Sequence, residues 1–460
     1  MRYDGVRVLV VGAGVTGKSV TPALTGLGAH VTVTDADPAK LAALEATGAH
    51  LAVGLDTPPA GTALVVTSPG LRPDHPLLTA SAEQGIEVIG DVELAIRIAL
   101  DQPNPPRLLA VTGTNGKTTT VTMLEQILRA DGLDAVACGN VGLPVIDAVL
   151  AGHDVLAMEL SSFQLHWQSS LRARAAAVLN LAEDHLDWHG TFAAYAADKG
   201  RIYHGAETRI ANADDPATLE LAGPGAITFT LGTPRVGQLG VVEDLLVDRA
   251  FVEDPVHGVE ELATLGDLHV AGGHNVANAL AAAALARANG ASAGAVKAGL
   301  TAFRPGAHRA VPVGERDGVR FVDDSKATNP HAAAGSLTAH DHVVWIAGGL
   351  LKGAEVDDLV GAVADRLRGV VVLGRDAEVF TRSLARHAPE VPVHRLAPGE
   401  HDPMTAAVRA ASAMARKGDV VLLAPAAASM DMFANYAQRG EAFTAAVREL
   451  LADTGSPGAR

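Results

Sequence analysis

The chain has little cysteine, few aromatic residues and no excess of positive charge. A single cysteine, Cys138, excludes an intramolecular disulfide framework and is typical of a reducing cytosol; we expect it to be a small buried residue. Aromatic residues make up only 3% of the chain and the formal net charge is −16, which argues against a nucleic-acid surface. No uncharged apolar run reaches membrane-spanning length, and no signal-peptide pattern opens the chain. We expect a cytoplasmic protein that neither binds nucleic acid nor enters a membrane.

The length and the alternation of strands and helices predict three α/β domains in series. A chain of 460 residues exceeds what one hydrophobic core usually organises, and 48% of it is apolar. Prolines between Asp101 and Arg107 indicate a linker, and a second boundary follows Phe303. We therefore predict domains at residues 1–104, 105–305 and 306–460. Strands are predicted at residues 6–11, 31–34, 63–67, 87–89, 108–112, 154–158, 175–179, 319–322, 343–347, 369–373 and 420–424.

A glycine-rich turn follows the predicted strand at residues 108–112. It reads Gly113-Thr114-Asn115-Gly116-Lys117-Thr118-Thr119 and runs into a helix. Glycines let backbone N–H groups approach phosphate oxygens, Lys117 can neutralise phosphate charge, and the Thr118 hydroxyl can ligate Mg²⁺. Val111 stands where the usual pattern has its first glycine, so the loop is shortened. We expect ATP to bind here; the alternative is a turn that only links strand to helix.

A second glycine pattern lies near the N-terminus. Gly12, Gly14 and Gly17 form G-x-G-x-x-G after a strand, and Asp35 ends the next strand, where an acidic residue can hydrogen-bond a ribose. Alone, this pattern suggests NAD. Because a separate ATP loop is present, we favour another nucleotide in this domain, or a Rossmann-like turn that holds no dinucleotide.

Acidic residues and a histidine follow two predicted strands of the second domain. Glu159 lies at the end of one strand, where it could ligate Mg²⁺, position a water molecule or simply be a solvated loop acid. His185 lies among acidic residues at 183–187, and a solvated loop is again the alternative. Lys199 is predicted on a helix at residues 192–203, and a helical lysine usually reaches solvent.

Polar residues also follow three predicted strands of the third domain. The turn at residues 323–329 gathers acids, a hydroxyl, an amide and Lys326, and helix capping explains only part of it. Lys352 and Ser429 follow two further strands. Because parallel strands end at one edge of a sheet, this pattern predicts an anion-binding mouth, with ordinary loops as the alternative. Arg309 could reach a phosphate or be a surface arginine.

Taken together, these motifs resemble those of the Mur ligases of peptidoglycan synthesis. The resemblance spans nearly the whole chain, and residues 139–144, Phe163-Gln164 and 324–329 are similar to the D-glutamate-adding branch of that family. The segments that carry it are Gly113–Thr119, Glu159–Leu165, Glu183–Asp187, His274–Asn278 and Asp324–Asn329. It implies a Rossmann-like N-terminal domain that binds a UDP-sugar, a P-loop ATPase-like central domain and a Rossmann-like C-terminal domain that binds an amino acid.

The resemblance also implies a reaction and its cofactors. ATP phosphorylates the terminal carboxylate of UDP-N-acetylmuramoyl-L-alanine, and the amine of D-glutamate displaces phosphate from the acyl phosphate. Because a carboxylate is a poor electrophile, the mixed anhydride supplies the leaving group that amide formation needs. Two Mg²⁺ sites are implied, and Lys199 would be carbamylated so that it offers an anionic oxygen ligand. The protein would act as a monomer.

Residue roles are implied by position in the motifs. The implied catalytic residues are Lys117, Glu159, His185, Lys199 and Lys326. The implied ATP contacts are Gly113, Thr114, Asn115, Gly116, Lys117, Thr118, Thr119, Asn278, Arg309 and Asp324. The implied Mg²⁺ ligands are Thr118, Glu159, His185 and Lys199. The implied substrate contacts are Thr16, Asp35, Ser68, Pro69, Gly70, Asn140, Ser161, Lys326, Thr328, Lys352, Ser429 and Tyr436.

Two departures and three alternatives accompany this interpretation. Tyr436 stands where we expect phenylalanine, and Ala36 stands where a threonine often follows the uracil-contacting Asp35. Another Mur ligase or a folylpolyglutamate-synthase-like ligase would share the phosphate loop but use another acceptor. An NAD-dependent oxidoreductase would rest on the N-terminal glycines, and a non-catalytic nucleotide-dependent module would leave Glu159, His185 and Lys326 without a role.

Overall fold

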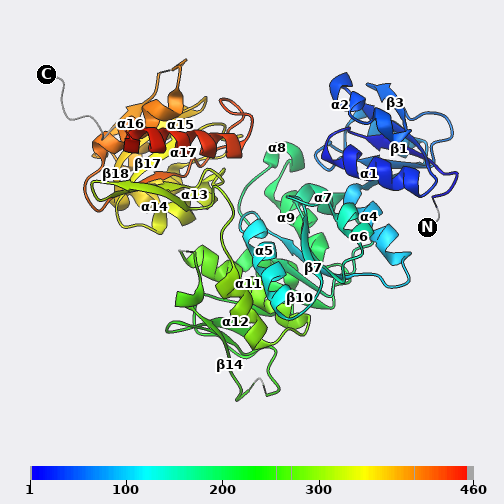
Figure 1. Ribbon diagram of the computed structural model, residues 1–460, viewed down its shortest axis with the longest axis horizontal. Helices are drawn as coiled ribbons and strands as arrows, with labels where there is room; N and C mark the ends of the chain where they lie inside the picture. Colours follow the sequence, from blue (N-terminus) through cyan, green and yellow to red (C-terminus); the bar gives the residue numbers. More distant parts are fainter. Residues whose placement is uncertain (1–2, 255, 271, 398, 453–460) are drawn as a thin grey trace. The chain divides into compact units, whose positions relative to one another are not determined.

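The computed structural model describes residues 3–254, 256–270, 272–397 and 399–452. Three sheets organise these residues, each flanked by helices, and all three contain mainly parallel strands (Figure 1). The first two sheets belong to one compact unit and the third belongs to another. The segments 182–187 and 269–276 are grouped with the second unit, although they follow central strands in sequence. This confirms the predicted α/β class with three domains.

The first sheet has five parallel strands in the order β3-β2-β1-β4-β5. Alternating residues of β1 pack on opposite faces, with Val8 and Val10 in one core cluster and Leu9 and Val11 in the other. Helices α1 and α4 cover the first face and α3 covers the second. The elements are β1 Arg7–Val11, α1 Val15–Gly26, β2 His30–Asp35, α2 Pro38–Ala42, a 3₁₀ turn Glu45–Thr47, β3 His50–Val53, β4 Leu64–Thr67, α3 Pro76–Glu83, β5 Glu87–Gly90 and α4 Asp91–Leu100.

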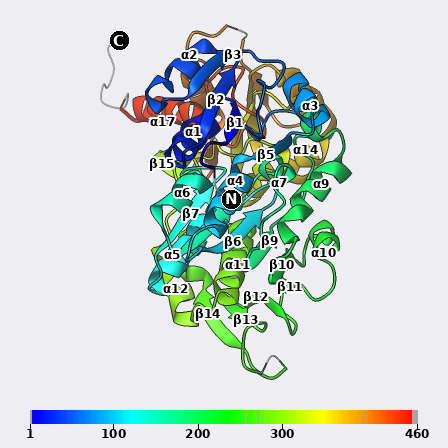
Figure 2. The same cartoon turned by 90° about the vertical axis from the view of Figure 1, so that its right-hand side faces the viewer.

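The central sheet has nine strands in the order β14-β13-β12-β11-β10-β9-β6-β8-β7, and Figure 2 shows the run from β6 through β9 to β14. Its strands are parallel except at the β12–β13–β14 edge, which is antiparallel. Its strands are β6 Arg107–Thr112, β7 Ala135–Gly139, β8 Val155–Glu159, β9 Ala175–Val178, β10 Thr208–Asn212, β11 Ile227–Phe229, β12 Gln238–Val242, β13 Leu245–Asp248 and β14 Glu260–Thr264. The helices are α5 Lys117–Ala130, α6 Val145–Ala151, α7 Ser162–His166, α8 Leu186–His189, α9 Phe192–Gly200, α10 Pro216–Ala222, α11 Gly273–Ala288 and α12 Ala293–Ala302, with 3₁₀ turns Arg201–Tyr203 and Leu265–Asp267.

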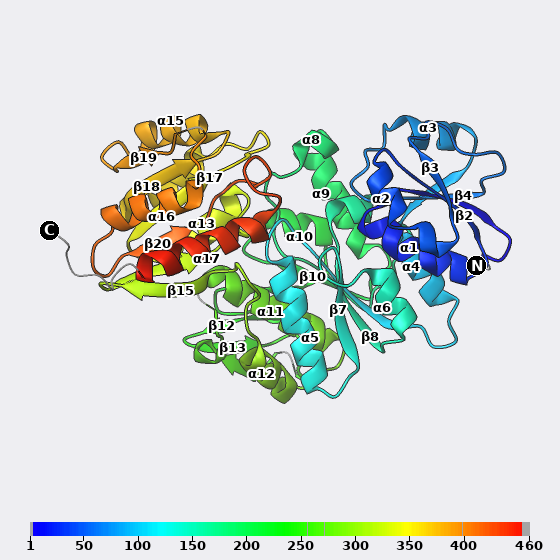
Figure 3. The same cartoon turned by 45° about the horizontal axis from the view of Figure 1, so that its top comes forward.

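The third sheet has the order β15-β16-β20-β17-β18-β19, and only the β15–β16 pair is antiparallel. Helices α13, α14 and α15 pack on one face and α16 and α17 on the other, as Figure 3 shows for the last two. The elements are β15 Val311–Arg316, β16 Val319–Asp323, α13 Pro330–Thr338, β17 Val343–Gly348, α14 Asp357–Val363, a 3₁₀ turn Ala364–Arg366, β18 Leu367–Leu373, α15 Ala377–His387, β19 Val393–Arg395, α16 Pro403–Met414, β20 Val420–Leu423 and α17 Tyr436–Ala452.

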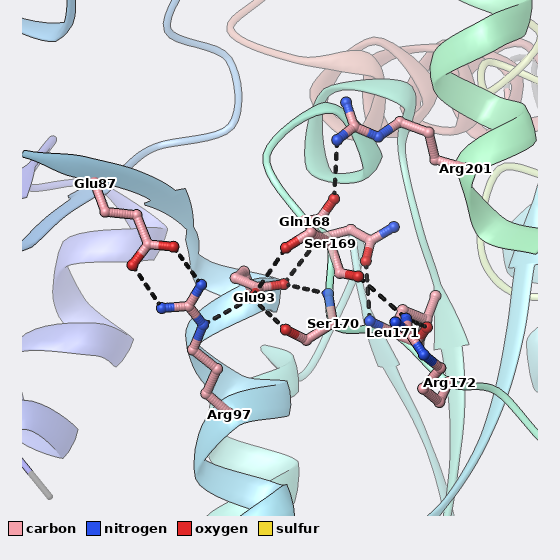
Figure 4. A network of polar contacts seen from close by, with 9 residues as sticks. All are labelled: Glu87, Glu93, Arg97, Gln168, Ser169, Ser170, Leu171, Arg172 and Arg201. Carbon is pink, nitrogen blue, oxygen red and sulfur yellow. Dashed lines mark hydrogen bonds and ion pairs between the residues drawn. The ribbon is translucent and has the colours of Figure 1, made fainter. Parts of the chain in front are cut away.

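A buried carboxylate joins the first sheet's last helix to the central domain (Figure 4). Glu93 of α4 is 0% exposed and accepts the backbone N–H groups of Ser169 (2.8 Å) and Ser170 (2.9 Å), as well as the Ser170 hydroxyl (2.6 Å). Arg97, one turn later, donates to Glu93 (2.7 Å). Its two Nη atoms also donate to the two carboxylate oxygens of Glu87 in β5. Because a buried carboxylate needs such partners, this contact holds the 168–171 segment against α4.

The structure refines the predicted elements locally. The prediction missed the strands β3, β7, β10, β11, β12, β13, β14, β15 and β19. The helix expected at residues 192–203 stops at Gly200 and continues as a 3₁₀ turn. The alanine run at residues 426–428 predicts either a helix or tight packing; it is not helical but buried, and Ala426 adopts a positive φ of 58°, so tight packing is correct. Among the described residues, no helix is both long and apolar enough to cross a membrane.

Candidate active site

The phosphate loop connects β6 to α5 as the sequence predicts. Gly116 precedes α5 with a φ of 85°, and a Cβ atom there would lie 2.2 Å from Asn278 Oδ1. Only glycine fits this position, because both the backbone conformation and the close approach exclude a side chain. The helix then begins at Lys117, so its first backbone N–H groups, which helices leave outside their own hydrogen-bond ladder, point toward the loop.

Two lysines meet the carbonyl groups of this loop. Lys117 Nζ donates to the carbonyl oxygens of Gly113 and Thr114, both at 2.9 Å. Lys199 Nζ donates to the same Gly113 oxygen at 2.8 Å and to Thr112 Oγ1 at 3.4 Å. The two ammonium groups therefore share one acceptor, which concentrates positive charge beside the helix N-terminus.

The position of Lys199 corrects the expectation that it reaches solvent. Its side chain lies on α9 and the residue is only 2% exposed, with Nζ 4.7 Å from the centre of the Tyr195 ring. The Tyr195 hydroxyl in turn lies 2.9 Å from Thr114 Oγ1. The sequence around Lys199 is rich in alanine and hides this burial, because only the contact between α9 and the phosphate loop creates it.

Asn180 is a residue of this site to which the sequence analysis assigned no role. Its side chain pairs with both backbone groups of Asn115, accepting from the N–H at 2.9 Å and donating to the carbonyl at 3.1 Å. Its own carbonyl accepts the N–H of Thr114 at 2.9 Å. Asn180 thus continues the pairing of β6 with β9 into the loop. Its place directly after the apolar run at 175–179 was the available signal.

Glu159 lies at the end of β8, 2% exposed, and faces the start of α5. Its Oε2 accepts from the Thr118 hydroxyl at 2.6 Å and its Oε1 accepts from Asn140 Nδ2 at 2.9 Å. A carboxylate and a hydroxyl that converge in this way are the oxygen donors that Mg²⁺ prefers, so the residues present fit the predicted metal. Asn140 was expected to face a sugar; here its side-chain amide donates a hydrogen bond to the Glu159 carboxylate.

Ser161 and the neighbouring residues are held by a capping box on α7. The Ser161 hydroxyl accepts the N–H of Gln164 at 3.2 Å, and Gln164 Oε1 accepts the N–H of Ser161 at 3.0 Å.

His189 Nε2 lies 2.9 Å from the Ser162 hydroxyl, and its Nδ1 lies 3.1 Å from Asp198. The carboxyl of Asp198 is half-buried, which by itself would raise its pKa, but hydrogen bonds with His166 and His189 lower that pKa instead.

His185 belongs to the segment grouped with the second unit. It has a positive φ of 54°, and its backbone N–H donates to Asp184 Oδ1 at 2.9 Å. A non-glycine residue in the left-handed region is uncommon and is enriched where a loop is held in one conformation. The sequence marked this acidic loop as a candidate, and the strained histidine is consistent with that.

The N-terminal glycine turn is tightly built. At Gly12, with a φ of 102°, a Cβ atom would lie 2.2 Å from Ser68 Oγ, and at Gly17 one would lie 2.4 Å from the carbonyl of Gly12. Asp35 accepts the N–H groups of Ala13 (2.8 Å) and Asp37 (2.9 Å). Partial burial opposes ionisation, but these N–H groups hold the pKa of Asp35 below its ordinary value. The turn thus brings together the predicted residues Thr16, Asp35, Ser68, Pro69 and Gly70 around the ends of β1, β2 and β4.

The third sheet brings its predicted residues to one edge. β16, β20 and β17 are neighbours and parallel, so the loops that carry Lys326, Ser429 and Lys352 leave the same side. Backbone bonds tie these loops together: Ala426 donates to Ala327 at 2.9 Å, and Leu350 and Ala428 exchange bonds at 2.8 and 2.9 Å. The predicted convergence of the three loops is confirmed.

The side chains of this edge differ in exposure and charge. Lys326 Nζ lies 3.8 Å from the centre of the Tyr436 ring, a cation–π distance, and Ser429 is buried. Lys352 is exposed with a φ of 54°, and Thr328 and Arg309 are half-buried. Burial raises the pKa of Asp324 to about 6, against the hydrogen bond from the N–H of Ala310 and the charge of Arg309.

Three family models match the chain. One described as the Mur ligase MurD-like N-terminal domain matches residues 6–90, the Mur ligase middle domain matches 111–286, and the Mur ligase glutamate ligase domain matches 308–427.

Relatives and solved structures agree with these models. The UDP-N-acetylmuramoylalanine–D-glutamate ligase of Thermobifida fusca is 56% identical, with 98% of this chain and 100% of the relative covered. The ligase of the same name from Streptomyces coelicolor is 55% identical, with 97% and 99% covered. Among solved structures, UDP-N-acetylmuramate-alanine ligase MurC of Thermotoga maritima matches with a TM-score of 0.59 and 18% identity, over 97% of this chain and 99% of that one, and so shares the fold.

Proposed function

The chain belongs to the Mur ligase family, and from this premise we propose that it joins D-glutamate to UDP-N-acetylmuramoyl-L-alanine in cytoplasmic peptidoglycan precursor synthesis, forming ADP and phosphate. The observation that carries the proposal is the Asp324–Asn329 turn, tied to two other strand-end loops in a domain whose full-length relatives are D-glutamate ligases. Family membership excludes the NAD-dependent oxidoreductase suggested by the N-terminal glycines.

The proposed reaction has two steps. An oxygen of the alanine carboxylate attacks the γ-phosphorus of ATP, the bond to ADP breaks, and an acyl phosphate forms. The amine of D-glutamate then attacks the carbonyl carbon, loses a proton, and phosphate leaves with the electrons of the C–O bond. Both steps gather negative charge in transit, so positioned cations and N–H groups accelerate them.

The central domain would bind ATP through the phosphate loop, with Lys117 and the N-terminus of α5 facing phosphate oxygens. Asn278 is 5% exposed and accepts from the Thr120 hydroxyl at 3.4 Å, beside Gly116. Thr118 and Glu159 would hold Mg²⁺, which when bound neutralises phosphate charge as a Lewis acid. Arg309 and Asp324 would complete the ATP contacts.

A second Mg²⁺ would be held by His185 and by Lys199 in carbamylated form. Lys199 is buried beside the phosphate loop, so a carbamate on its Nζ would place an anionic oxygen there. Uptake of ¹³C-labelled CO₂ gives a direct test: a carbamate carbon resonance should appear in the wild-type protein and be missing in Lys199→Met.

The three domains would divide the substrates between them. Residues 1–104 would hold the uridine diphosphate through Thr16, Asp35 and the Ser68–Gly70 turn, with Asn140 and Ser161 serving the sugar from residues 105–305. Residues 306–460 would bind D-glutamate through Lys326, Thr328, Lys352, Ser429 and Tyr436. We propose that one chain carries out the whole reaction as a monomer.

The test is ADP and phosphate release with ATP, Mg²⁺ and UDP-N-acetylmuramoyl-L-alanine, comparing D-glutamate with L-glutamate, L-alanine and meso-diaminopimelate. Release that requires D-glutamate, and that Lys117→Ala abolishes, supports the proposal. Release with another amino acid would move the chain to another branch of the family. No release with any acceptor would refute ligase activity and favour a nucleotide-dependent interaction module.

A further inference from the structure

Arg439 is a fully buried arginine to which the proposed reaction assigns no role. It lies in α17, 1% exposed, beneath the edge where the third sheet's loops converge. Burial is the main influence on its guanidinium and lowers its pKa to about 10, while the charges of Asp431 and Asp323 oppose that shift. A buried cation is costly unless its N–H groups are satisfied, so its presence here needs a structural reason.

The described side-chain hydrogen bonds of Arg439 go to two of the predicted amino-acid-binding loops. Nε donates to Ser325 Oγ at 3.0 Å and Nη2 donates to the Ser325 carbonyl at 2.8 Å. Nη1 donates to the Ala427 carbonyl at 3.0 Å. None of these described partners is a carboxylate. The guanidinium therefore acts as a fork that spans the loop after β16 and the loop after β20.

Ser325 links Arg439 to Tyr436, another of the predicted D-glutamate contacts. Its hydroxyl accepts from Arg439 and donates to the carbonyl of Tyr436 at 2.7 Å, at the first residue of α17. Lys326 follows Ser325 directly and lies over the Tyr436 ring. Ser429 lies two residues beyond Ala427. One guanidinium thus fixes the backbone on both sides of the proposed D-glutamate contacts.

We propose that Arg439 is a positioning residue for the anionic amino-acid substrate: it sets the relative geometry of the Ser325–Thr328 and Ala427–Ser429 segments, and so the affinity for that substrate. This inference rests on the proposed function. A lysine cannot replace it, because one ammonium on a flexible stem does not reproduce a planar fork that reaches Ser325 and Ala427 together.

The test compares Arg439→Lys and Arg439→Gln with wild type and with Arg448→Gln, a change at an exposed arginine of the same helix. We expect the KM for D-glutamate to rise about tenfold in both Arg439 variants, the effect of about one charge-assisted hydrogen bond. The KM for ATP should stay within about twofold in all of the variants, a limit set by the usual spread of surface substitutions. Arg448→Gln should behave as wild type.

A general loss of stability would raise no single KM, so the split between the two substrates separates positioning from folding. If the Arg439 variants do not fold, Ser325→Ala takes their place, since it removes only the hydroxyl that links Arg439 to Tyr436; it should raise the KM for D-glutamate alone, by a smaller factor. A wild-type KM for D-glutamate in a folded variant would overturn the inference. If wild type itself makes no product with D-glutamate, the proposed function fails and the inference falls with it.

Discussion

At the scale of single residues, the surroundings of a buried side chain, rather than its burial, distinguish a polar group held by partners from one that packs in the core. Glu159 and Cys138 both lie on neighbouring central strands and are almost inaccessible, at 2% and 1% exposed. The Glu159 carboxylate has polar partners in α5 and in the turn after β7, which keep a charged group in place. The Cys138 thiol lies in the apolar core cluster. Similar burial thus accompanies different environments, polar around Glu159 and apolar around Cys138.

Replacing Glu159 by glutamine should lower kcat/KM for ATP by about a hundredfold or more, because a bound metal contributes several kcal/mol to such transfers. The Mg²⁺ concentration that gives half-maximal activity should rise as well. ADP release measured across a Mg²⁺ titration checks both effects. Glu220→Gln, at an exposed residue of α10, is the control and should change neither kcat/KM for ATP nor the Mg²⁺ dependence. Unchanged Mg²⁺ dependence in Glu159→Gln would remove this residue from the metal site.

Cys138 should resist alkylation in the native protein. Burial, together with the nearby negative charge of Glu125, raises the pKa of its thiol to about 12, so the reactive thiolate is scarce at neutral pH. Mass spectrometry after iodoacetamide treatment at pH 7.5 should find unmodified native protein and fully modified unfolded protein. Rapid modification without unfolding would contradict the buried position.

At the scale of elements, the phosphate loop is shaped by the strand beside it as well as by its own glycines. β9 pairs with β6 up to Thr112, and Asn180 then continues that pairing with its side chain. An asparagine side chain can do this because its amide carries the same donor and acceptor as a peptide group. These bonds hold the loop backbone in place, which reduces the cost of ordering it on binding.

Asn180→Ala should raise the KM for ATP about tenfold and lower the free energy of unfolding by about 1–3 kcal/mol, since two hydrogen bonds to the loop are lost. Asn180→Asp keeps the acceptor for the Asn115 N–H but loses the donor. Its KM for ATP and its free energy of unfolding should lie between those of wild type and Asn180→Ala. Steady-state kinetics and urea unfolding provide the measurements. A variant that loses stability while keeping its KM for ATP would show that the Asn180 side chain does not shape the nucleotide site.

At the scale of the whole molecule, the joint between the first sheet and the central domain combines an apolar cluster shared by α4 and α6 with a few buried polar contacts. Glu93 carries most of them, and Ser19 adds a bond to Asp147 at 2.8 Å. Burial alone would raise the pKa of Glu93, but the N–H groups of Ser169 and Ser170, the Ser170 hydroxyl and Arg97 together lower it. The ionised form therefore stabilises the folded chain.

Glu93→Gln should destabilise the protein by about 1.5–3 kcal/mol near pH 7, the range for hydrogen bonds to a charged group. Because the folded pKa is lowered, this contribution is present above the unfolded pKa of glutamate and is lost as the pH falls through the folded value. The difference between the two proteins should thus shrink in acid. Thermal unfolding from pH 8 to pH 3 checks this.

Glu87→Gln is the matched control for the joint. Its carboxylate pairs with the same Arg97 but is about half exposed, so the change should cost no more than about 1 kcal/mol. Equal losses in the two variants would contradict a special role for the buried carboxylate.

The local chemistry of the chain could be predicted from its sequence. A phosphate loop is predicted by three adjacent residues. Gly116 permits the positive φ, Lys117 supplies the cation and Thr118 supplies the hydroxyl. The strand ends that carry Glu159, Lys326 and Ser429 were predictable for the same reason: each apolar run stops at a polar residue, and parallel strands place such ends at one edge.

Only the tertiary structure decided which distant groups meet. Lys199 lies on a helix of small residues and looks exposed until α9 packs beside the phosphate loop. Arg439 and Ser325 are 114 positions apart, and Glu93 and Ser170 are 77 apart. Such pairs leave no local pattern, because a hydrogen bond between remote residues depends on where whole elements pack. By itself the sequence determined the fold class, the ATP loop and the family resemblance, whereas packing determined the burial, the charge balance and the support of the site.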